Sequence, residues 1–120
     1  MSELKKRIKS FGYAFKGIAS VLKKERNAWI HCLAVVVVTS AGFYFGITPT
    51  EWCIVVICFG LVLAAEGFNT AVERLVDFVS PGHHPTAGDV KDVAAGAVLI
   101  CAIVAAIVGC IIFVPYLLNL

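Results

Sequence analysis

A stripe of polar side chains interrupts the second of three long apolar stretches in this chain. It consists of Glu66, Asn69, Thr70, Glu73 and Asp77, three of which are carboxylic acids. At about 100° per residue, all five fall within about 60° of Glu66 on the surface of a helix. Acids in hydrocarbon cost several kcal/mol unless they meet polar groups, a metal ion or water. Such a stripe therefore indicates a functional site.

The residue types in and around this stripe indicate phosphoryl transfer to a lipid alcohol. Carboxylates from two helices can hold Mg²⁺, which usually keeps waters and shares its ligands with phosphate oxygens. Lys91, near the start of the third apolar stretch, offers a charge and nearby backbone N–H groups to a phosphate. Glu66 lies deeper and suits a general base acting on a hydroxyl. No Walker A sequence or protein-kinase glycine loop is present, so a kinase here must be built differently.

The composition is that of an integral membrane protein. Of the 120 residues, 60% are hydrophobic and 15% are charged, and the mean hydropathy is +0.92. Soluble domains average about 45–50% apolar and about 25% charged residues. The length predicts a single domain over residues 1–120, without room for a separate soluble catalytic domain. Any chemistry must therefore occur at the membrane.

Residues 1–26 are predicted to form an amphipathic helix in the membrane interface. Its apolar positions recur every three or four residues, at Leu4, Ile8, Phe11, Phe15, Ile18 and Leu22. Eight of the ten Lys and Arg residues lie in this segment, where they can face anionic lipid. The alternative is a soluble amphipathic helix packed on a partner, which the apolar span that follows at once disfavours.

Three transmembrane helices are predicted over residues 28–47, 52–79 and 89–118, because each is long enough to cross a hydrocarbon core. The expected fold class is therefore all-α, with one interfacial helix and three spans. The positive-inside rule places the amino end in the cytoplasm. The 48–51 turn, which has no Lys or Arg, and the carboxyl end are then expected outside.

Local signals mark the ends of these helices. Thr48 and Glu51 have the spacing of a capping box at the start of the second span. Asp89 is the expected N-cap of the third span. Gly42 and Gly46 form a G-x-x-x-G that can admit a neighbouring helix, although glycine is common in membrane helices.

Depth along the second span predicts where the polar residues meet. Counted from Trp52, Glu66 lies about 21 Å into the membrane, about 9 Å short of the cytoplasmic edge of a core about 30 Å thick. Glu73 lies about 10 Å further along, at that edge. Residues at the start of the other two spans reach the same layer: Glu25, Asn27, Lys91 and Asp92. Polar residues from three segments are therefore expected to converge there.

Most of these residues also have a purely structural explanation. Glu73 can pair with Arg74 or Lys91. Asp89 and Asp92 can be first-turn acids. Asn69 and Thr70 can form hydrogen bonds between helices, and His31 can be a core histidine. Asp77, His83 and His84 can be solvated surface residues. Only Glu66 resists such an explanation, because of its depth.

Two longer motifs carry a resemblance to a known family. They are A-E-G-F-N-T-A-V-E-R-L-V-D at residues 65–77 and V-K-D-V-A-A-G-A-V-L at residues 90–99. The E-x-N-x-x-x-H of residues 25–31 and the G-Y-x-F-K-G of residues 12–17 fit as well. Together they resemble the prokaryotic diacylglycerol kinase family of small trimeric membrane kinases, which includes the undecaprenol kinases. The resemblance covers nearly the whole chain.

The resemblance implies a homotrimeric lipid kinase of the bacterial inner membrane that uses ATP and Mg²⁺ at the cytoplasmic interface. The implied catalytic residues are Glu66, as general base on the lipid hydroxyl, with Asn69, Lys91 and Asp92. The implied nucleotide contacts are Tyr13, Glu25, Glu73, Asp77, Gly82, His83, His84, Lys91 and Asp92, with Glu25 and Glu73 as the metal-binding pair. The implied lipid contacts are Asn27, His31, Glu66 and Ala95.

Asn27 and His31 resemble the pattern of the undecaprenol kinases more than that of the diacylglycerol kinases, which favours a polyprenol as the lipid alcohol. Lys6 or Arg7 takes the place of the family's amino-terminal arginine. The expected partners are ATP, a membrane lipid alcohol and further copies of this chain, with no nucleic acid.

Two rival classes of protein remain. In a small transporter or proton-coupled membrane subunit, Glu66 would carry a proton or a cation. The polar residues cluster at one membrane face, without a polar path through the outer half of the second span, which argues against transport. A purely structural subunit would leave the buried acids unexplained.

Overall fold

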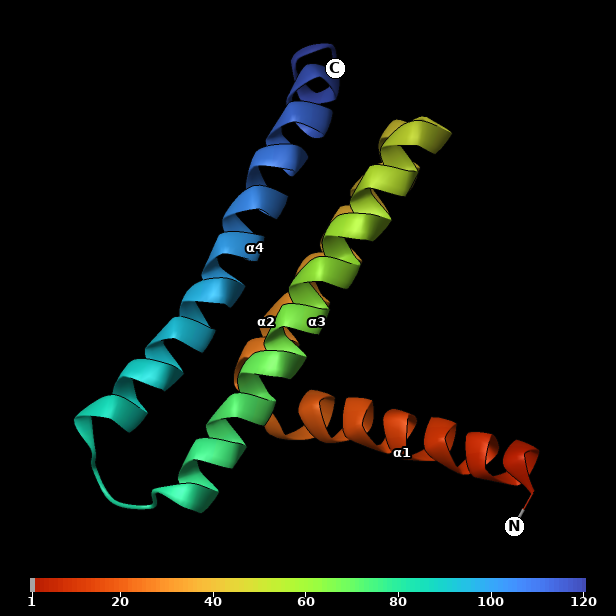
Figure 1. Ribbon diagram of the computed structural model, residues 1–120. Helices are drawn as coiled ribbons and strands as arrows, with labels where there is room; N and C mark the ends of the chain where they lie inside the picture. Colours follow the sequence, from red (N-terminus) through yellow and green to blue (C-terminus); the bar gives the residue numbers. More distant parts are fainter. Residues whose placement is uncertain (1) are drawn as a thin grey trace.

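The computed structural model describes residues 2–120, and this part of the chain forms four α-helices (Figure 1). They are α1 (Glu3–Lys24), α2 (Arg26–Phe45), α3 (Pro49–Val79) and α4 (Pro85–Leu118). α3 packs against both α2 and α4, and α1 projects away from these three helices. α2, α3 and α4 are each long and apolar enough to cross a membrane, so the prediction of three long apolar helices is confirmed.

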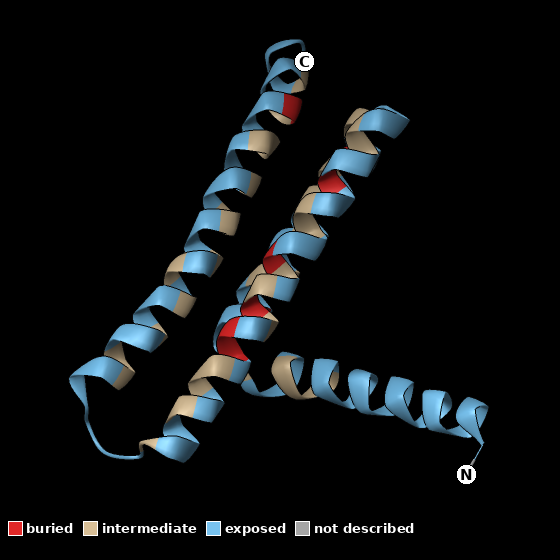
Figure 2. Cartoon of the chain, in the orientation of Figure 1, coloured by how far each residue is buried: buried red, intermediate tan, exposed pale blue. Residues whose placement is uncertain are grey.

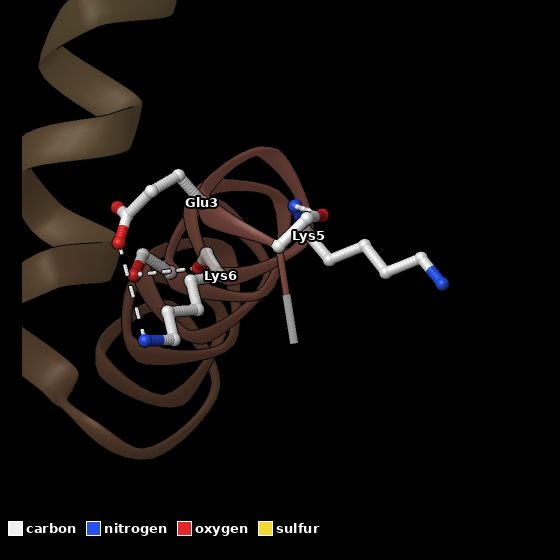
Figure 3. A network of polar contacts seen from close by, with 5 residues as sticks. Glu3, Lys5 and Lys6 are labelled. Atoms are coloured by element: carbon white, nitrogen blue, oxygen red, sulfur yellow. Dashed lines mark hydrogen bonds and ion pairs between the residues drawn. The ribbon is translucent and has the colours of Figure 1, made fainter.

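The amino-terminal helix begins with a side-chain cap. The hydroxyl of Ser2 accepts a hydrogen bond from the backbone N–H of Lys5 at 3.3 Å, and Lys6 pairs with Glu3 at 3.9 Å one turn along (Figure 3). Within the chain none of the residues of α1 is buried, and its apolar positions are exposed (Figure 2). α1 ends at Lys24, so Arg26 of the predicted 1–26 segment belongs to α2, and Met1 of that segment lies outside the described residues.

The turn between α2 and α3 carries the expected capping box. The Thr48 hydroxyl accepts from the N–H of Glu51 at 3.2 Å, and Glu51 Oε1 accepts from the N–H of Thr48 at 2.9 Å. The same Oε1 accepts from the Tyr116 hydroxyl at 2.5 Å. This contact ties the start of α3 to the end of α4. α3 starts at Pro49 rather than at the predicted residue 52 because proline suits the first helical position.

The expectation that Asp89 caps the third span is wrong. α4 begins at Pro85, four residues earlier, and its N-cap is His84. Nδ1 of His84 accepts a hydrogen bond from the N–H of Thr86 at 3.1 Å. Pro85 has no N–H to leave unpaired and its φ is preset for a helix, so the helix starts there and Asp89 lies inside it.

The two glycines of the G-x-x-x-G serve different purposes. Gly42 packs against the ring of Trp52 in α3, and a Cβ at this position would lie 2.6 Å from Cη2 of that ring. Gly46 ends α2 with φ +63°, a left-handed conformation that favours glycine. The motif therefore shapes a turn and a contact within the chain, and Gly46 is not part of a helix-packing face.

The buried residues of α3 change from apolar to polar along the helix. At its Pro49 end, Val55 packs in a cluster with Ile47 and Ile112. Figure 2 shows buried positions at intervals along α3, and beyond Val62 the buried residues are polar. With 31 residues, α3 is about 46 Å long and exceeds a hydrocarbon core of about 30 Å. Its polar end can therefore reach an interface while its apolar end remains in the core.

Candidate functional site

The most buried polar side chains of the described chain lie on one face of α3. Glu66 and Thr70 are each 1% exposed, and Asn69 is 5% exposed. The spacing in the sequence predicted this shared face. Burying a carboxyl group costs free energy unless polar groups contact it. The groups that contact Glu66 therefore determine which chemistry this face supports.

These buried groups lack hydrogen-bond partners among the described residues. Both carboxylate oxygens of Glu66, Oδ1 of Asn69 and the hydroxyl of Thr70 are unpaired. Each buried and unsatisfied polar group costs about 1–3 kcal/mol. A site with this set of open acceptors is chemically suited to a ligand that brings hydrogen-bond donors, such as a hydroxyl group.

His31 of α2 is the basic side chain that reaches Glu66. Its Nε2 lies 3.5 Å from Oε2 of Glu66, and the imidazole is 17% exposed. The contact is within the range of an ion pair but is too long for an ordinary hydrogen bond. Both carboxylate oxygens of Glu66 are therefore free to accept a hydrogen bond from a ligand, although the imidazole of His31 lies beside them.

One turn further along α3, Asn69 and Glu73 form a hydrogen bond. Nδ2 of Asn69 donates to Oε1 of Glu73 at 3.2 Å. This bond orients the Glu73 carboxylate, which is only partly buried. It also leaves Oδ1 of Asn69 and Oε2 of Glu73 without a hydrogen bond to the described residues.

Arg74 joins α3 to the junction of α1 and α2. One of its nitrogens lies 3.6 Å from Oε1 of Glu25, and another donates to the Ser20 hydroxyl at 2.9 Å. Glu25 is the residue between α1 and α2, so this cluster fixes the bend between them. The sequence suggested that Glu73 could pair with Arg74, but in the structure Arg74 turns to Glu25.

Lys91 of α4 pairs with Asp77 near the end of α3. The contact spans the loop of residues 80–84 and places a positive charge beside the acidic end of α3. The alternative pairing of Glu73 with Lys91 is not formed. Asp77 and Lys91 are partly exposed, so other charged groups can reach them.

Several predicted site residues are exposed and lie outside these contacts. Tyr13 is 69% exposed on α1. The remaining residues of this kind are Asn27, Gly82, His83, Asp92 and Ala95, all exposed, while His84 caps α4. Figure 1 shows α1, the helix that contains Tyr13, and the 80–84 loop on opposite sides of α3.

A metal site with three or more His, Cys, Asp or Glu ligands is absent from residues 2–120. The predicted pair, Glu25 and Glu73, nevertheless has donor atoms to spare. In each carboxylate Oε1 makes a contact within the protein, whereas Oε2 has no hydrogen bond or ion pair with the described residues. Carboxylate oxygens are the kind of ligand that Mg²⁺ prefers, and this ion takes one or two of them and fills its shell with water and phosphate oxygens.

An apolar cavity of about 270 Å³ lies among α2, α3 and α4, and His31 is part of its lining. The other lining side chains are apolar apart from the thiol of Cys58. Because His31 also contacts Glu66, the cavity adjoins the buried acid. An apolar chain and a reactive hydroxyl can therefore be accommodated next to each other.

Sequence reasoning gave no site role to Arg74 and did not consider Ser20; in the structure Arg74 contacts both Glu25 and Ser20. The signal available in the sequence was that Arg74 is one of only two Lys or Arg residues beyond position 26. Thr70 was assigned to the polar stripe but given no role, and it proves to be among the most buried residues.

Comparison with known proteins gives a family match. Residues 12–113 match the family model described as prokaryotic diacylglycerol kinase. The chain is 39% identical over 116 residues to the undecaprenol kinase of Bacillus subtilis, covering 97% of this chain and 94% of the relative.

Two relatives named diacylglycerol kinase are also similar to this chain. The Synechocystis protein is 38% identical over 112 residues, which cover 92% of this chain and 64% of the relative. The Escherichia coli K12 protein is 30% identical over 105 residues, which cover 88% of this chain and 86% of the relative. The family match over residues 12–113 includes the contacts of Glu25, His31, Glu66, Glu73 and Lys91 described above.

Proposed function

Since the chain belongs to the prokaryotic diacylglycerol kinase family and is an ATP-dependent membrane lipid kinase, we propose that Glu66 is the general base of the transfer. The observation that carries this assignment is the burial of Glu66 with neither carboxylate oxygen hydrogen-bonded to a described residue. Such a carboxylate can accept the proton of a lipid hydroxyl directly. A transporter, the rival class, is not needed to explain the buried acid.

In the proposed reaction, Glu66 takes the proton from the lipid hydroxyl while the hydroxyl oxygen forms a bond to the γ-phosphorus of ATP. The bond from that phosphorus to the β-phosphate oxygen breaks, and ADP leaves. Phosphoryl transfer depends mainly on positioning and on stabilising charge. Asn69 contributes to the positioning because its bond to Glu73 holds two polar residues of the α3 face in register.

Glu25 and Glu73 are the proposed Mg²⁺ ligands, through the oxygens that make no protein contact. Arg74 orients Glu25 and Asn69 orients Glu73, so each carboxylate is held from its other side. When bound, the ion would neutralise charge on the β- and γ-phosphate oxygens.

The proposed nucleotide contacts are Lys91, Asp92 and Asp77 with the Gly82-His83-His84 loop and Tyr13. Lys91 is partly exposed and oriented by Asp77, so its ammonium group can also contact a phosphate. Because α1 and the 80–84 loop lie on opposite sides of α3, contacts from both to one nucleotide require two chains (Figure 1). This arrangement supports the proposed homotrimer.

Replacing Lys91 by Ala is expected to raise the dissociation constant for ATP by about 10- to 100-fold. The reason is that a hydrogen bond to a charged group contributes about 1.5–3 kcal/mol. Equilibrium binding of labelled ATP to the purified protein in bicelles measures this. Lys9→Ala is the control, because Lys9 is an exposed lysine of α1 outside the proposed site. Equal ATP affinity of Lys91→Ala and the unaltered protein would refute the phosphate contact.

A polyprenol of the undecaprenol type is the proposed lipid alcohol. Support comes from the E-x-N-x-x-x-H motif of residues 25–31, and from the undecaprenol kinase relative that aligns over 94% of its length. His31 of this motif adjoins both the apolar cavity and Glu66, so the motif lies where a lipid head and tail would meet. Asn27 and Ala95, both exposed, are the further lipid contacts proposed.

Turnover of labelled ATP with a panel of lipid alcohols in bicelles tests this choice. We expect kcat/KM to be highest for undecaprenol and lower for diacylglycerol of matched concentration. The Glu66→Gln protein serves as the blank for each lipid, since it should retain the membrane fold. Faster turnover of diacylglycerol than of any polyprenol would overturn the assignment of the lipid.

The proposed location is the bacterial inner membrane, with the amino end and the site on the cytoplasmic side. Eight of the ten Lys and Arg residues lie in the first 26 positions, which favours a cytoplasmic amino end. The exposed apolar side of α1 then rests in the interface and its basic side faces anionic lipid.

A further inference from the structure

The imidazole of His31 and the carboxylate of Glu66 face each other between α2 and α3. Nε2 lies 3.5 Å from Oε2, and the two side chains are 17% and 2% exposed. An ordinary N–H···O hydrogen bond is about 2.7–3.2 Å long. The pair is therefore close enough to exchange a proton after a small ring movement, while the carboxylate still has room for a substrate hydroxyl.

The other charged groups around this pair are engaged elsewhere. On α3, Glu73 accepts a hydrogen bond from Asn69. At the start of α2, Glu25 pairs with Arg74, which also binds Ser20 of α1. From α4, the cavity beside His31 receives only apolar residues: Ala102, Ala105, Ala106, Val108, Gly109 and Phe113. His31 is thus the group placed to accept a proton from Glu66.

A general base at this depth has to lose the proton that it gains before the next turnover. Because Glu66 is only 1% exposed, solvent water has little access to it for this purpose. Histidine is the side chain whose ordinary titration lies closest to neutral pH, so it can both take and release a proton there. A histidine beside the buried base therefore has a chemical use beyond filling space.

We propose that His31 is a positioning residue that receives the proton from Glu66, an inference that rests on the proposed role of Glu66 as base. The lipid O–H bond breaks and its proton goes to a carboxylate oxygen of Glu66. The hydroxyl oxygen bonds to the γ-phosphorus, and the electron pair of the broken P–O bond leaves with ADP. The proton then passes from Glu66 to Nε2 of His31.

This step requires the tautomer of His31 that carries its proton on Nδ1, so that Nε2 is the acceptor. The transfer restores the carboxylate and leaves an imidazolium beside it, an arrangement that a charge-assisted hydrogen bond stabilises. The imidazolium then releases its proton to water at the membrane interface.

The pH profile of kcat in His31→Gln tests the proposal. We expect kcat to fall by about 10- to 100-fold, the usual loss when a supporting partner of a functional group is removed. The acid limb of the profile should also shift, and the dissociation constant for ATP should stay unchanged. Val36→Ala is the control, because Val36 is an exposed valine of α2 that does not line the cavity. Its profile should match that of the unaltered protein.

Two results with His31→Gln would overturn the proposal. One is a pH profile of kcat that superimposes on that of the unaltered protein. The other is a raised KM for the lipid with kcat unchanged, which would make His31 a lipid contact only. In Glu66→Gln/His31→Gln, turnover should be no slower than in Glu66→Gln alone, because the histidine acts through the carboxylate. A further multiplicative loss would contradict that coupling.

A measurement on the unaltered histidine covers the case in which His31→Gln does not fold. ¹⁵N NMR of the full chain in bicelles is expected to show the Nδ1–H tautomer of His31 at neutral pH, and a changed His31 spectrum in Glu66→Gln. Identical His31 spectra in the two proteins would overturn the pairing. If Glu66→Gln itself keeps full turnover, the proposed base fails. If Glu66→Gln is inactive but His31 shows none of these effects, only the present inference fails.

Discussion

Replacing Glu66 by Gln is expected to lower kcat by about 10²- to 10⁴-fold, the usual contribution of a general base. The glutamine keeps the size and the hydrogen-bonding atoms of the side chain but cannot take the proton of the lipid hydroxyl. Because Glu66 is buried and makes no contact with the proposed nucleotide residues, ATP should bind with unchanged affinity. Single-turnover transfer from labelled ATP and equilibrium ATP binding, both in bicelles, measure the two quantities.

Glu51→Gln is the matched control, because it makes the same substitution in the first turn of the same helix, away from Glu66. Glu51 caps α3 through Thr48 and accepts a hydrogen bond from Tyr116, so its replacement should affect stability rather than transfer. Full turnover by Glu66→Gln would remove Glu66 from the role of base. Loss of ATP binding together with turnover would indicate that Glu66 organises the nucleotide site instead.

Glu73→Ala is expected to raise the concentration of Mg²⁺ needed for half-maximal turnover by about tenfold or more. Loss of a supporting partner around a metal already costs about 10- to 100-fold in metal affinity, and a direct ligand should cost at least as much. Initial rates measured over a range of Mg²⁺ concentrations at saturating ATP give this constant. Indifference to the Mg²⁺ concentration would contradict the role of Glu73 as a ligand.

Glu73→Gln separates the metal role from a structural one. Glu73→Ala also removes the acceptor of the Asn69 hydrogen bond, which is 3.2 Å long, and leaves a buried amide without this partner. Glu73→Gln keeps a carbonyl oxygen for Asn69 but removes the negative charge. Both variants should need more Mg²⁺ if Glu73 binds the ion. Normal behaviour of Glu73→Gln beside an impaired Glu73→Ala would show that Glu73 acts only by positioning Asn69.

The helices were predictable because membrane spans depend on length and composition. A run of about 20 apolar residues crosses a bilayer core whatever its neighbours are, and all three predicted spans are helices in the structure. The starting point of α4 was not predicted, because the sequence contains two competing signals for a helix start. His84 and Pro85 supply the N-cap and the first position, so Asp89 falls one turn inside.

Partner choice among the charged residues was much harder to predict. Glu73 and Arg74 are adjacent in sequence, but neighbouring residues of a helix do not face each other. Arg74 instead contacts Glu25, at the junction of α1 and α2, and Ser20 of α1. Lys91 pairs with Asp77, a contact that depends on how α3 and α4 approach across the 80–84 loop.

The amino-acid sequence by itself determined that this chain is helical, that it spans a membrane, and that Glu66, Asn69, Thr70 and Glu73 share one face. Each of these properties follows from local spacing and from apolar length, which act within a single helix. Only the tertiary structure decided that His31 lies beside Glu66 and that an apolar cavity adjoins the pair. Such contacts depend on the rotation and depth of one helix against another, which side-chain packing across the whole bundle sets.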